Sequence, residues 1–135
     1  MRMGNALWCF SSAEMLRIMS FSDMRNAVSD RPILTVTGSD GTGGAGVQAD
    51  IKMISALGGY AVSAITSVTM QNTLGIQKFH DLPAETVRGQ IEAIVNDVQP
   101  EIVKIGMLRR VDVVRALVDA LLKYKPREII YDPVI

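Results

Sequence analysis

The stretch ILTVTGSDGTGGAGVQADIKMISALGG, residues 33–59, decides how this chain begins to fold. A short apolar and β-branched run comes first, and such a run is typical of a buried strand. A glycine-rich turn follows, and the residues after it have the apolar spacing of a helix that ends at Gly58 and Gly59. The sequence therefore predicts a strand–turn–helix unit whose turn can bring the backbone close to a ligand.

The same alternation continues along the rest of the chain. Strands and helices are predicted in turn at 60–68, 81–98, 101–107, 111–124 and 128–135. The stretch 71–81 is predicted to be a loop with a short extended piece. In the helix at 111–124 we expect the inward-facing residues to be Val114, Leu117, Val118 and Leu121. The alternation indicates an α/β fold with a mostly parallel sheet flanked by helices.

Composition limits the classes of function that are open to the chain. Its 135 residues are 48% hydrophobic, enough to build a core, and 14 basic residues balance 14 acidic ones. A balanced charge gives no electrostatic footprint for nucleic acid or a membrane surface, so we expect neither as a partner. Cys9 is the only cysteine, which excludes an internal disulfide framework and favours a reducing, cytoplasmic location.

The first thirty residues differ from the rest of the chain. They contain the only tryptophan and five of the eight methionines, and their apolar run is too short to cross a membrane. We expect 1–30 to be a poorly ordered N-terminal extension and 31–135 to be the folded unit. Because the last predicted strand coincides with the last residues, we also expect 31–135 to be the first half of a larger domain.

The glycine-rich turn allows three interpretations, two of which place a nucleotide on it. Gly41, Gly43 and Gly46 match the G-x-G-x-x-G spacing of a dinucleotide site, but residues 69–71 offer no acidic side chain for the ribose. A P-loop needs Lys followed by Ser or Thr, and residues 44–45 are Gly and Ala. The sequence therefore favours the third interpretation, a small-molecule pocket.

Asp50 is the first side chain that supports a pocket beside the turn. On a helical wheel it falls within an arc that we expect to be buried, formed by Val47, Ile51, Ile54 and Leu57. A carboxylate on an apolar face must find hydrogen-bond donors. The donors could be the amides of the glycine-rich loop or the polar groups of a ligand.

Gln71 is the second such side chain. It ends the second predicted strand, on the same carboxyl edge of the sheet as Gly38, Met107 and Asp132. Open α/β sheets bind ligands outside this edge. A glutamine amide presents a donor and an acceptor together, which suits the edge of an aminopyrimidine.

Several longer stretches together resemble one enzyme family. They are ILTVTGSDGTGGAGVQADIKMISALGGYAVSAITSVTMQNT (33–73), VKIGML (103–108) and IIYDPV (129–134). From 33 to 135 the chain resembles, in order and without large gaps, the hydroxymethylpyrimidine/phosphomethylpyrimidine kinases of thiamine biosynthesis, which belong to the ribokinase-like superfamily. The resemblance implies a three-layer α/β fold of which this chain would be the N-terminal half.

The resemblance implies ATP-dependent phosphorylation of 4-amino-5-hydroxymethyl-2-methylpyrimidine and then of its monophosphate, with ATP and Mg²⁺ as cofactors and a homodimer as the complete enzyme. Gly38 would offer backbone to the substrate, Asp50 would meet its polar groups and Gln71 would read the pyrimidine edge. Asp132 would lie near the phosphates and Mg²⁺. The other pocket residues would be Ala45, Thr69, Met107 and Val134. At the position of Thr69 the family more often has valine.

The resemblance also implies what this chain lacks. The family's catalytic base, anion hole and adenine pocket lie in the C-terminal half, so we expect the 135-residue chain to be inactive as a kinase by itself. Two other functions stay open, a pyridoxal kinase of the same fold and a non-catalytic pyrimidine-binding module. Gln71 favours the aminopyrimidine. His80 is interpreted as structural or solvated, and Lys104, in an apolar strand, is expected to snorkel or to pair with an acid.

Overall fold

Parallel strands form the central sheet in the computed structural model, which describes residues 32–134. Along the sheet the order is β2-β1-β5-β6, and each neighbouring pair is parallel. The mostly parallel α/β sheet expected from the sequence is thus confirmed. The strands are β1 (Pro32–Thr37), β2 (Tyr60–Ile65), β5 (Ile102–Ile105) and β6 (Glu128–Tyr131).

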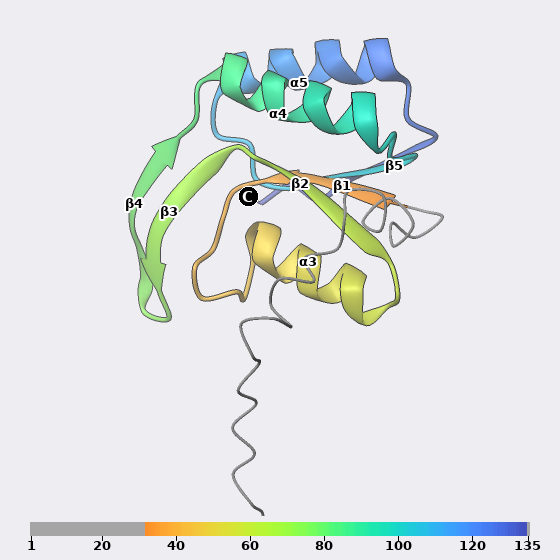
Figure 1. The fold of residues 1–135 in the computed structure, drawn as a ribbon. Helices are drawn as coiled ribbons and strands as arrows, with labels where there is room; N and C mark the ends of the chain where they lie inside the picture. The colour runs from red at the N-terminus through yellow and green to blue at the C-terminus, as the bar shows by residue number, and fades with distance from the viewer. Residues whose placement is uncertain (1–31, 135) are drawn as a thin grey trace, which may run out of the picture.

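Helices cover both faces of this sheet (Figure 1). One face carries α3 (Gly46–Ala56), and the other carries α4 (Ala84–Asp97) and α5 (Val111–Tyr124). The main core lies between the sheet and the α4–α5 pair, where large apolar side chains are removed from water. Its fully or nearly fully buried members include Leu34, Val36, Val87, Ile91, Val103, Val113 and Leu117.

The helical faces are only partly those predicted from the sequence. In α5 the predicted bounds are confirmed, but Val114 and Val118 are exposed, and the buried arc instead includes Val113 and two alanines. The alanines allow α5 to pack closely beside α4, so the contact arc does not follow the largest side chains. In α3 only Val47 is buried, and Ile51 and Leu57, which we expected inside, are 38% and 80% exposed.

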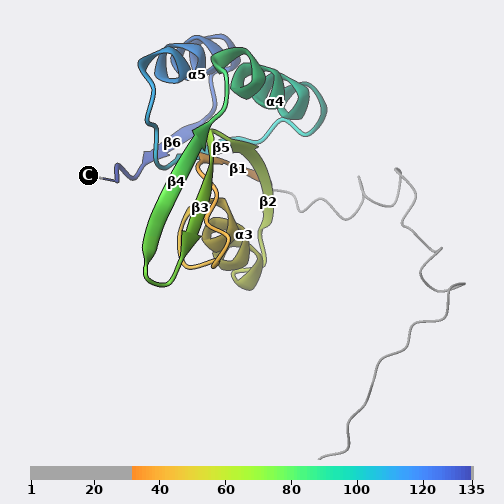
Figure 2. The ribbon, with the colours of Figure 1, turned by 90° about the vertical axis from the view of Figure 1, so that its left-hand side faces the viewer.

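The second predicted strand is in fact two strands that belong to different sheets. The chain leaves the central sheet at Thr66, whose amide donates to the Thr37 carbonyl (2.9 Å) and whose carbonyl accepts from the Leu82 amide (2.9 Å). Between these contacts lies an antiparallel hairpin, β3 (Ser67–Asn72) and β4 (Gly75–Asp81). Figures 1 and 2 show this hairpin running past the end of the sheet and beside α3.

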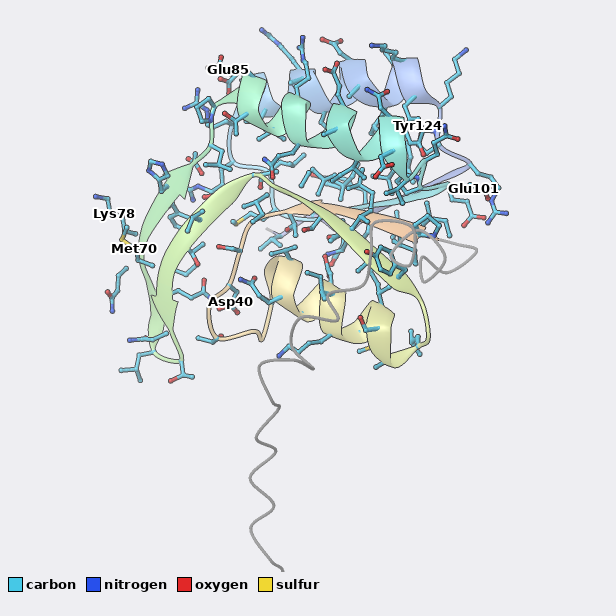
Figure 3. All side chains as sticks on the ribbon, viewed as in Figure 1. Asp40, Met70, Lys78, Glu85, Glu101 and Tyr124 are labelled. Atoms are coloured by element: carbon cyan, nitrogen blue, oxygen red, sulfur yellow. The ribbon has the colours of Figure 1, made fainter. Side chains whose placement is uncertain are left out.

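This hairpin corrects two expectations. The stretch 71–81 is mainly strand β4 rather than loop, and Gln71 lies in β3 rather than at the end of a parallel strand. The register of β3 shifts between Met70 and Gln71. Alternation along β3 leaves Met70 half-exposed on the outer side of the hairpin (Figure 3), while its neighbours Thr69 and Gln71 are less exposed.

At the other end of the sheet, β6 is an edge strand whose side chains are all exposed. Ile129, Ile130 and Tyr131 each expose more than half of their surface, although a strand of this composition is typical of a sheet interior. Among residues 32–134, no helix combines the length and the hydropathy needed to cross a bilayer. The extension expected at 1–30 lies outside the described residues.

Candidate functional site

The glycine-rich loop, residues 38–45, folds around the carboxylate of Asp40 (Figure 3). Oδ1 of Asp40 accepts hydrogen bonds from the backbone amide (2.9 Å) and the hydroxyl (2.8 Å) of Thr42. Oδ2 accepts from the amides of Gly44 (3.2 Å) and Ala45 (2.9 Å). The hydroxyl of Thr42, followed by these amides, lowers the pKa of Asp40 below its ordinary value, although burial acts in the opposite direction.

Contacts with the first residues of α3 close the loop. The amide of Val47 donates to the carbonyl of Gly38 (2.9 Å), and the amide of Asp40 donates to Oε1 of Gln48 (2.7 Å). Gly46 has φ +59°, and a Cβ there would lie 2.4 Å from the Gly38 carbonyl oxygen. Since Asp40 already binds the amides of Gly44 and Ala45, these donors are not available to nucleotide phosphates.

Asp50 does not bind the loop amides, which was one of the two roles left open for it. Its Oδ2 accepts the hydroxyl hydrogen of Thr35 at 2.5 Å, and both of its oxygens lie 3.1 Å from Nζ of Lys104. Thr35 and Lys104 are direct partners across β1 and β5. The two strands and α3 thus build a part-buried polar cluster under the loop, and Lys104 pairs with an acid as expected.

Asp132 joins this cluster from the segment that follows β6. Its carboxylate lies 3.7 Å from Nζ of Lys104 and is 70% exposed at the side chain. The amide of Asp132 donates to the carbonyl of Ile105 (2.9 Å), which continues the β5–β6 pairing. In the part of the chain that the structure describes, no three His, Cys, Asp or Glu residues are grouped to hold a metal ion.

Thr69 and Gln71 face the cluster from strand β3 of the hairpin. The hydroxyl of Thr69 donates to the carbonyl of Ser39 (2.8 Å) and lies 3.1 Å from Oε1 of Gln71. These contacts tie the hairpin to the glycine-rich loop. They also use only part of the hydrogen-bonding capacity of the Gln71 amide, which leaves the rest for a ligand.

Met107 is held at the carboxyl end of β5 by two buried threonines. Its amide donates to Oγ1 of Thr37 (3.1 Å), and its carbonyl accepts from the hydroxyl of Thr66 (3.1 Å). A Cβ at Gly38 would lie 2.6 Å from the terminal methyl of Met107, so the thioether packs directly on the glycine backbone. A side chain at position 38 would have to displace the end of the flexible Met107 side chain.

These elements enclose a cavity of about 360 Å³ at the carboxyl end of the sheet, a size suited to a small aromatic ligand. The structure places all eight residues selected from the sequence on its wall: Gly38, Ala45, Asp50, Thr69, Gln71, Met107, Asp132 and Val134. They come from α3, from β3 and from segments after β1, β5 and β6. Residues far apart in the chain therefore meet at one site.

The sequence from residue 40 to residue 135 matches the family model described as phosphomethylpyrimidine kinase. This match extends over most of the chain. The chain belongs to the phosphomethylpyrimidine kinase family. The resemblance noted in the sequence is thereby confirmed.

Curated relatives in this family include bacterial and plant enzymes. The chain is 46% identical over 102 residues to the hydroxymethylpyrimidine/phosphomethylpyrimidine kinase of Bacillus subtilis, a match that covers 76% of the chain and 38% of the relative. It is 47% identical over 103 residues to the probable thiamine biosynthetic bifunctional enzyme of Oryza sativa, again over 76% of the chain but only 19% of the relative.

Solved structures agree with the family and with the fold. The phosphomethylpyrimidine kinase of Clostridium difficile is 45% identical, with a TM-score of 0.75, over 77% of this chain and 48% of that one. The pyridoxal kinase of Bacillus subtilis, solved with ADP, is 28% identical, with a TM-score of 0.71, over 78% of this chain and 42% of that one. The chain thus spans less than half the length of these relatives.

Sequence reasoning missed the part played by Asp40. Its signal was present, since an aspartate two residues before a threonine in a glycine-rich run is typical of a side chain that binds nearby backbone amides. It was also incomplete for Lys104, which was expected to snorkel or to pair with an acid but also lines the cavity. The register that places Lys104 beside Thr35 could not be deduced before the strand order was known.

Proposed function

We propose that this chain supplies the pyrimidine-binding part of a hydroxymethylpyrimidine/phosphomethylpyrimidine kinase. The complete enzyme would phosphorylate 4-amino-5-hydroxymethyl-2-methylpyrimidine, and then its monophosphate, with ATP. The observation that carries this proposal is the cavity wall, where the Gln71 amide and the Asp50 carboxylate face one space beside Met107 and the Gly38 backbone. A flat, polar-edged ring suits this combination, because the amide can pair with its edge while the thioether contacts its face.

The hydrogen bonds within the glycine-rich loop support a pyrimidine rather than a nucleotide at this cavity. The amides that would receive phosphate oxygens are bound by Asp40, and the lysine of a P-loop is absent from positions 44 and 45. We therefore propose that ATP binds to a part of the complete enzyme outside this chain. In agreement with this, the chain spans only 38% of its Bacillus subtilis relative.

For Mg²⁺, the residue that fits is Asp132. Its carboxylate is exposed at the open side of the cavity, and Mg²⁺ is usually held by one or two carboxylates together with substrate phosphates. When bound, Mg²⁺ would neutralise charge on the transferred phosphoryl group. The neighbouring ammonium of Lys104 would hold Asp132 in place at this side of the cavity.

We further propose that 31–135 is the N-terminal half of a larger kinase domain, and that the complete enzyme is a cytoplasmic homodimer. The exposed apolar side chains of β6 support the first part, because further strands and helices would cover them. The balanced charge and single cysteine are compatible with the second. Relatives in plants carry the word chloroplastic in their names, so the compartment differs within the family.

A pyridoxal kinase is the second candidate, and the 28% identical structure with a TM-score of 0.71 favours it. Pyridoxal has a ring nitrogen, a phenolic oxygen and a hydroxymethyl group, but it lacks the amino group next to a second ring nitrogen. The Gln71 amide can pair with that amino–imino edge through both of its polar atoms. The cavity therefore favours the aminopyrimidine.

The first test is a calorimetric titration of the purified chain with hydroxymethylpyrimidine, with pyridoxal as competitor. We expect saturable binding, about tenfold weaker binding in Gln71→Ala because a pair of hydrogen bonds is lost, and little competition by pyridoxal. Met70→Ala is the matched control, because Met70 lies on the outer side of the same strand (Figure 3) and should leave binding unchanged.

Three results would contradict parts of the proposal. No heat from a chain that unfolds cooperatively would mean that this half does not form a binding site by itself. Stronger binding of pyridoxal than of the pyrimidine would favour the second candidate. ATP-dependent turnover by the purified chain would contradict the placement of ATP and the catalytic base outside it.

A further inference from the structure

Lys104 is a charged residue in a largely buried position. It occupies the middle of β5, opposite Thr35 of β1 and Ile130 of β6, and its side chain is only 21% exposed. Lysine is rarely buried to this extent without partners, because removing an ammonium from water is costly. No ligand contact of the proposed function requires Lys104.

The contacts of Lys104 join three separate elements around the cavity. Its Nζ lies 3.1 Å from both carboxylate oxygens of Asp50 on α3 and 3.7 Å from Asp132 after β6. Lys104 also lines the cavity itself, as do both carboxylates. A single cation thus links α3, β5 and the segment after β6 on one side of the ligand space.

Asp50 depends on this cation for its orientation. Its side chain is 17% exposed, and Oδ2 accepts a 2.5 Å hydrogen bond from Thr35, which is fully buried in β1. Thr35 and Lys104 approach the carboxylate from two neighbouring strands and so fix its plane. The lone pairs that they do not use are left for the cavity, since a carboxylate has about four acceptor positions.

We propose that Lys104 is a positioning residue for the ligand, which holds Asp50 so that its unused lone pairs face the bound pyrimidine. This inference rests on the proposed function, because it assumes that a pyrimidine occupies the cavity. Although Lys104 lines the cavity, its effect on the ligand would be exerted through Asp50. Without the ammonium, the Asp50 carboxylate would keep only Thr35 as a partner and would turn toward water.

A double-mutant cycle tests whether Lys104 acts through Asp50. The dissociation constant for hydroxymethylpyrimidine is measured by calorimetry for the intact chain, Lys104→Met, Asp50→Asn and the double variant. We expect each single variant to bind about tenfold more weakly and the double variant to bind no more weakly than Asp50→Asn. Effects that multiply to about a hundredfold would show that Lys104 acts independently of Asp50, and would overturn the inference.

Two further variants separate positioning from a general structural role. Lys104→Arg keeps a cation in place, so it should bind within about threefold of the intact chain while Lys104→Met does not. Equal weakening by arginine and methionine would contradict the inference. Lys78→Met is the matched control, because Lys78 is exposed on the outer side of the hairpin (Figure 3) and should not change binding.

If Lys104→Met does not fold, the comparison of Asp50→Asn with the double variant still decides the question. Both of these variants lack the buried carboxylate charge, and equal affinities are expected. A tenfold difference between them would overturn the inference. Failure of the intact chain to bind would instead reject the proposed function, and the role of Lys104 with it, whereas tight binding by Lys104→Met rejects the role of Lys104 alone.

Discussion

The two ends of the cavity differ in how fully the side chains around them are buried and hydrogen-bonded within the described residues. At the glycine-rich loop, the Asp40 carboxylate accepts hydrogen bonds from Thr42, Gly44 and Ala45, and it is almost fully buried. At β6, by contrast, the side chains of Ile130 and its neighbours are more than half exposed. The loop end is therefore shaped by contacts between residues close in sequence, whereas the β6 end leaves its apolar side chains exposed in the described residues.

The largest expected effect comes from Gly46→Ala, which disrupts the conformation of the glycine-rich loop. The residue has φ +59°, and a methyl group would lie 2.4 Å from the Gly38 carbonyl oxygen. Left-handed strain together with this overlap should lower the free energy of unfolding by about 3 kcal/mol. Urea unfolding monitored by circular dichroism measures the change.

Gly41→Ala is the matched control for this prediction. A Cβ at Gly41 would meet no atom within 4 Å, and its φ is not positive. We expect its free energy of unfolding to stay within about 0.5 kcal/mol of the original chain. Similar losses in both glycine variants would mean that the loop tolerates no added side chain at its glycines, and not that the Gly46 backbone is special.

A smaller effect, limited to a range of pH, is expected for Asp40→Asn. Because the pKa of Asp40 is lowered in the folded chain, its carboxylate stabilises the fold above about pH 4, and this stabilisation is lost as the pH falls through the folded-state pKa. The asparagine variant lacks this term and turns an NH₂ group toward donors of the loop. Its stability deficit should be largest at pH 6 and should narrow toward pH 3.

Thr42→Val sharpens the same prediction, because the Thr42 hydroxyl is the main cause of the lowered pKa of Asp40. Thermal unfolding from pH 6 to pH 3 should give this variant a pH dependence between those of the original chain and Asp40→Asn. If the loss of stability in Asp40→Asn is the same at every pH in this range, the charge of Asp40 has no role. The loss would then come only from the changed hydrogen bonds and shape of the side chain.

The smallest effect on stability is expected at the other end, for Ile130→Thr. The side chain is 53% exposed, so the free energy of unfolding should change by less than about 0.5 kcal/mol, while threonine keeps the β-branched shape. Sedimentation at several concentrations should show less self-association, because the edge strand loses apolar surface. A loss as large as the roughly 2–5 kcal/mol expected for Leu34→Ala, in the buried part of β1, would mean that β6 is already covered in solution.

The strand and helix order could be predicted from the sequence because each element has a clear period or boundary. The helix at 111–124 has the predicted bounds, since Lys125 ends it with a left-handed conformation and a proline follows. The hairpin was missed because the apolar run at 60–68 shows no break at Thr66. That break depends on hydrogen bonds to Thr37 and Leu82, which belong to other parts of the chain.

Part of the cavity wall followed from one topological rule, that the carboxyl ends of parallel strands meet at one edge. Ala45, Thr69 and Val134 were expected only from the family resemblance. This rule brings the residues after β1, β5 and β6 together even though Gln71 comes from a different sheet. The partners of individual side chains could not be predicted in the same way. Asp50 was considered for the loop amides, but Asp40 is closer to them in sequence and reaches them within a single turn.

The carboxylate of Asp40 also means that the loop carries its own anion. It is attached to the chain only two to five residues away from the groups that it binds, so its effective concentration there far exceeds that of free phosphate or sulfate in solution. Dissolved anions therefore compete poorly for the loop amides, and the loop has its conformation before a ligand binds. A molecule that enters the cavity meets a loop that is already formed, so its binding free energy is not reduced by the cost of ordering this part of the wall.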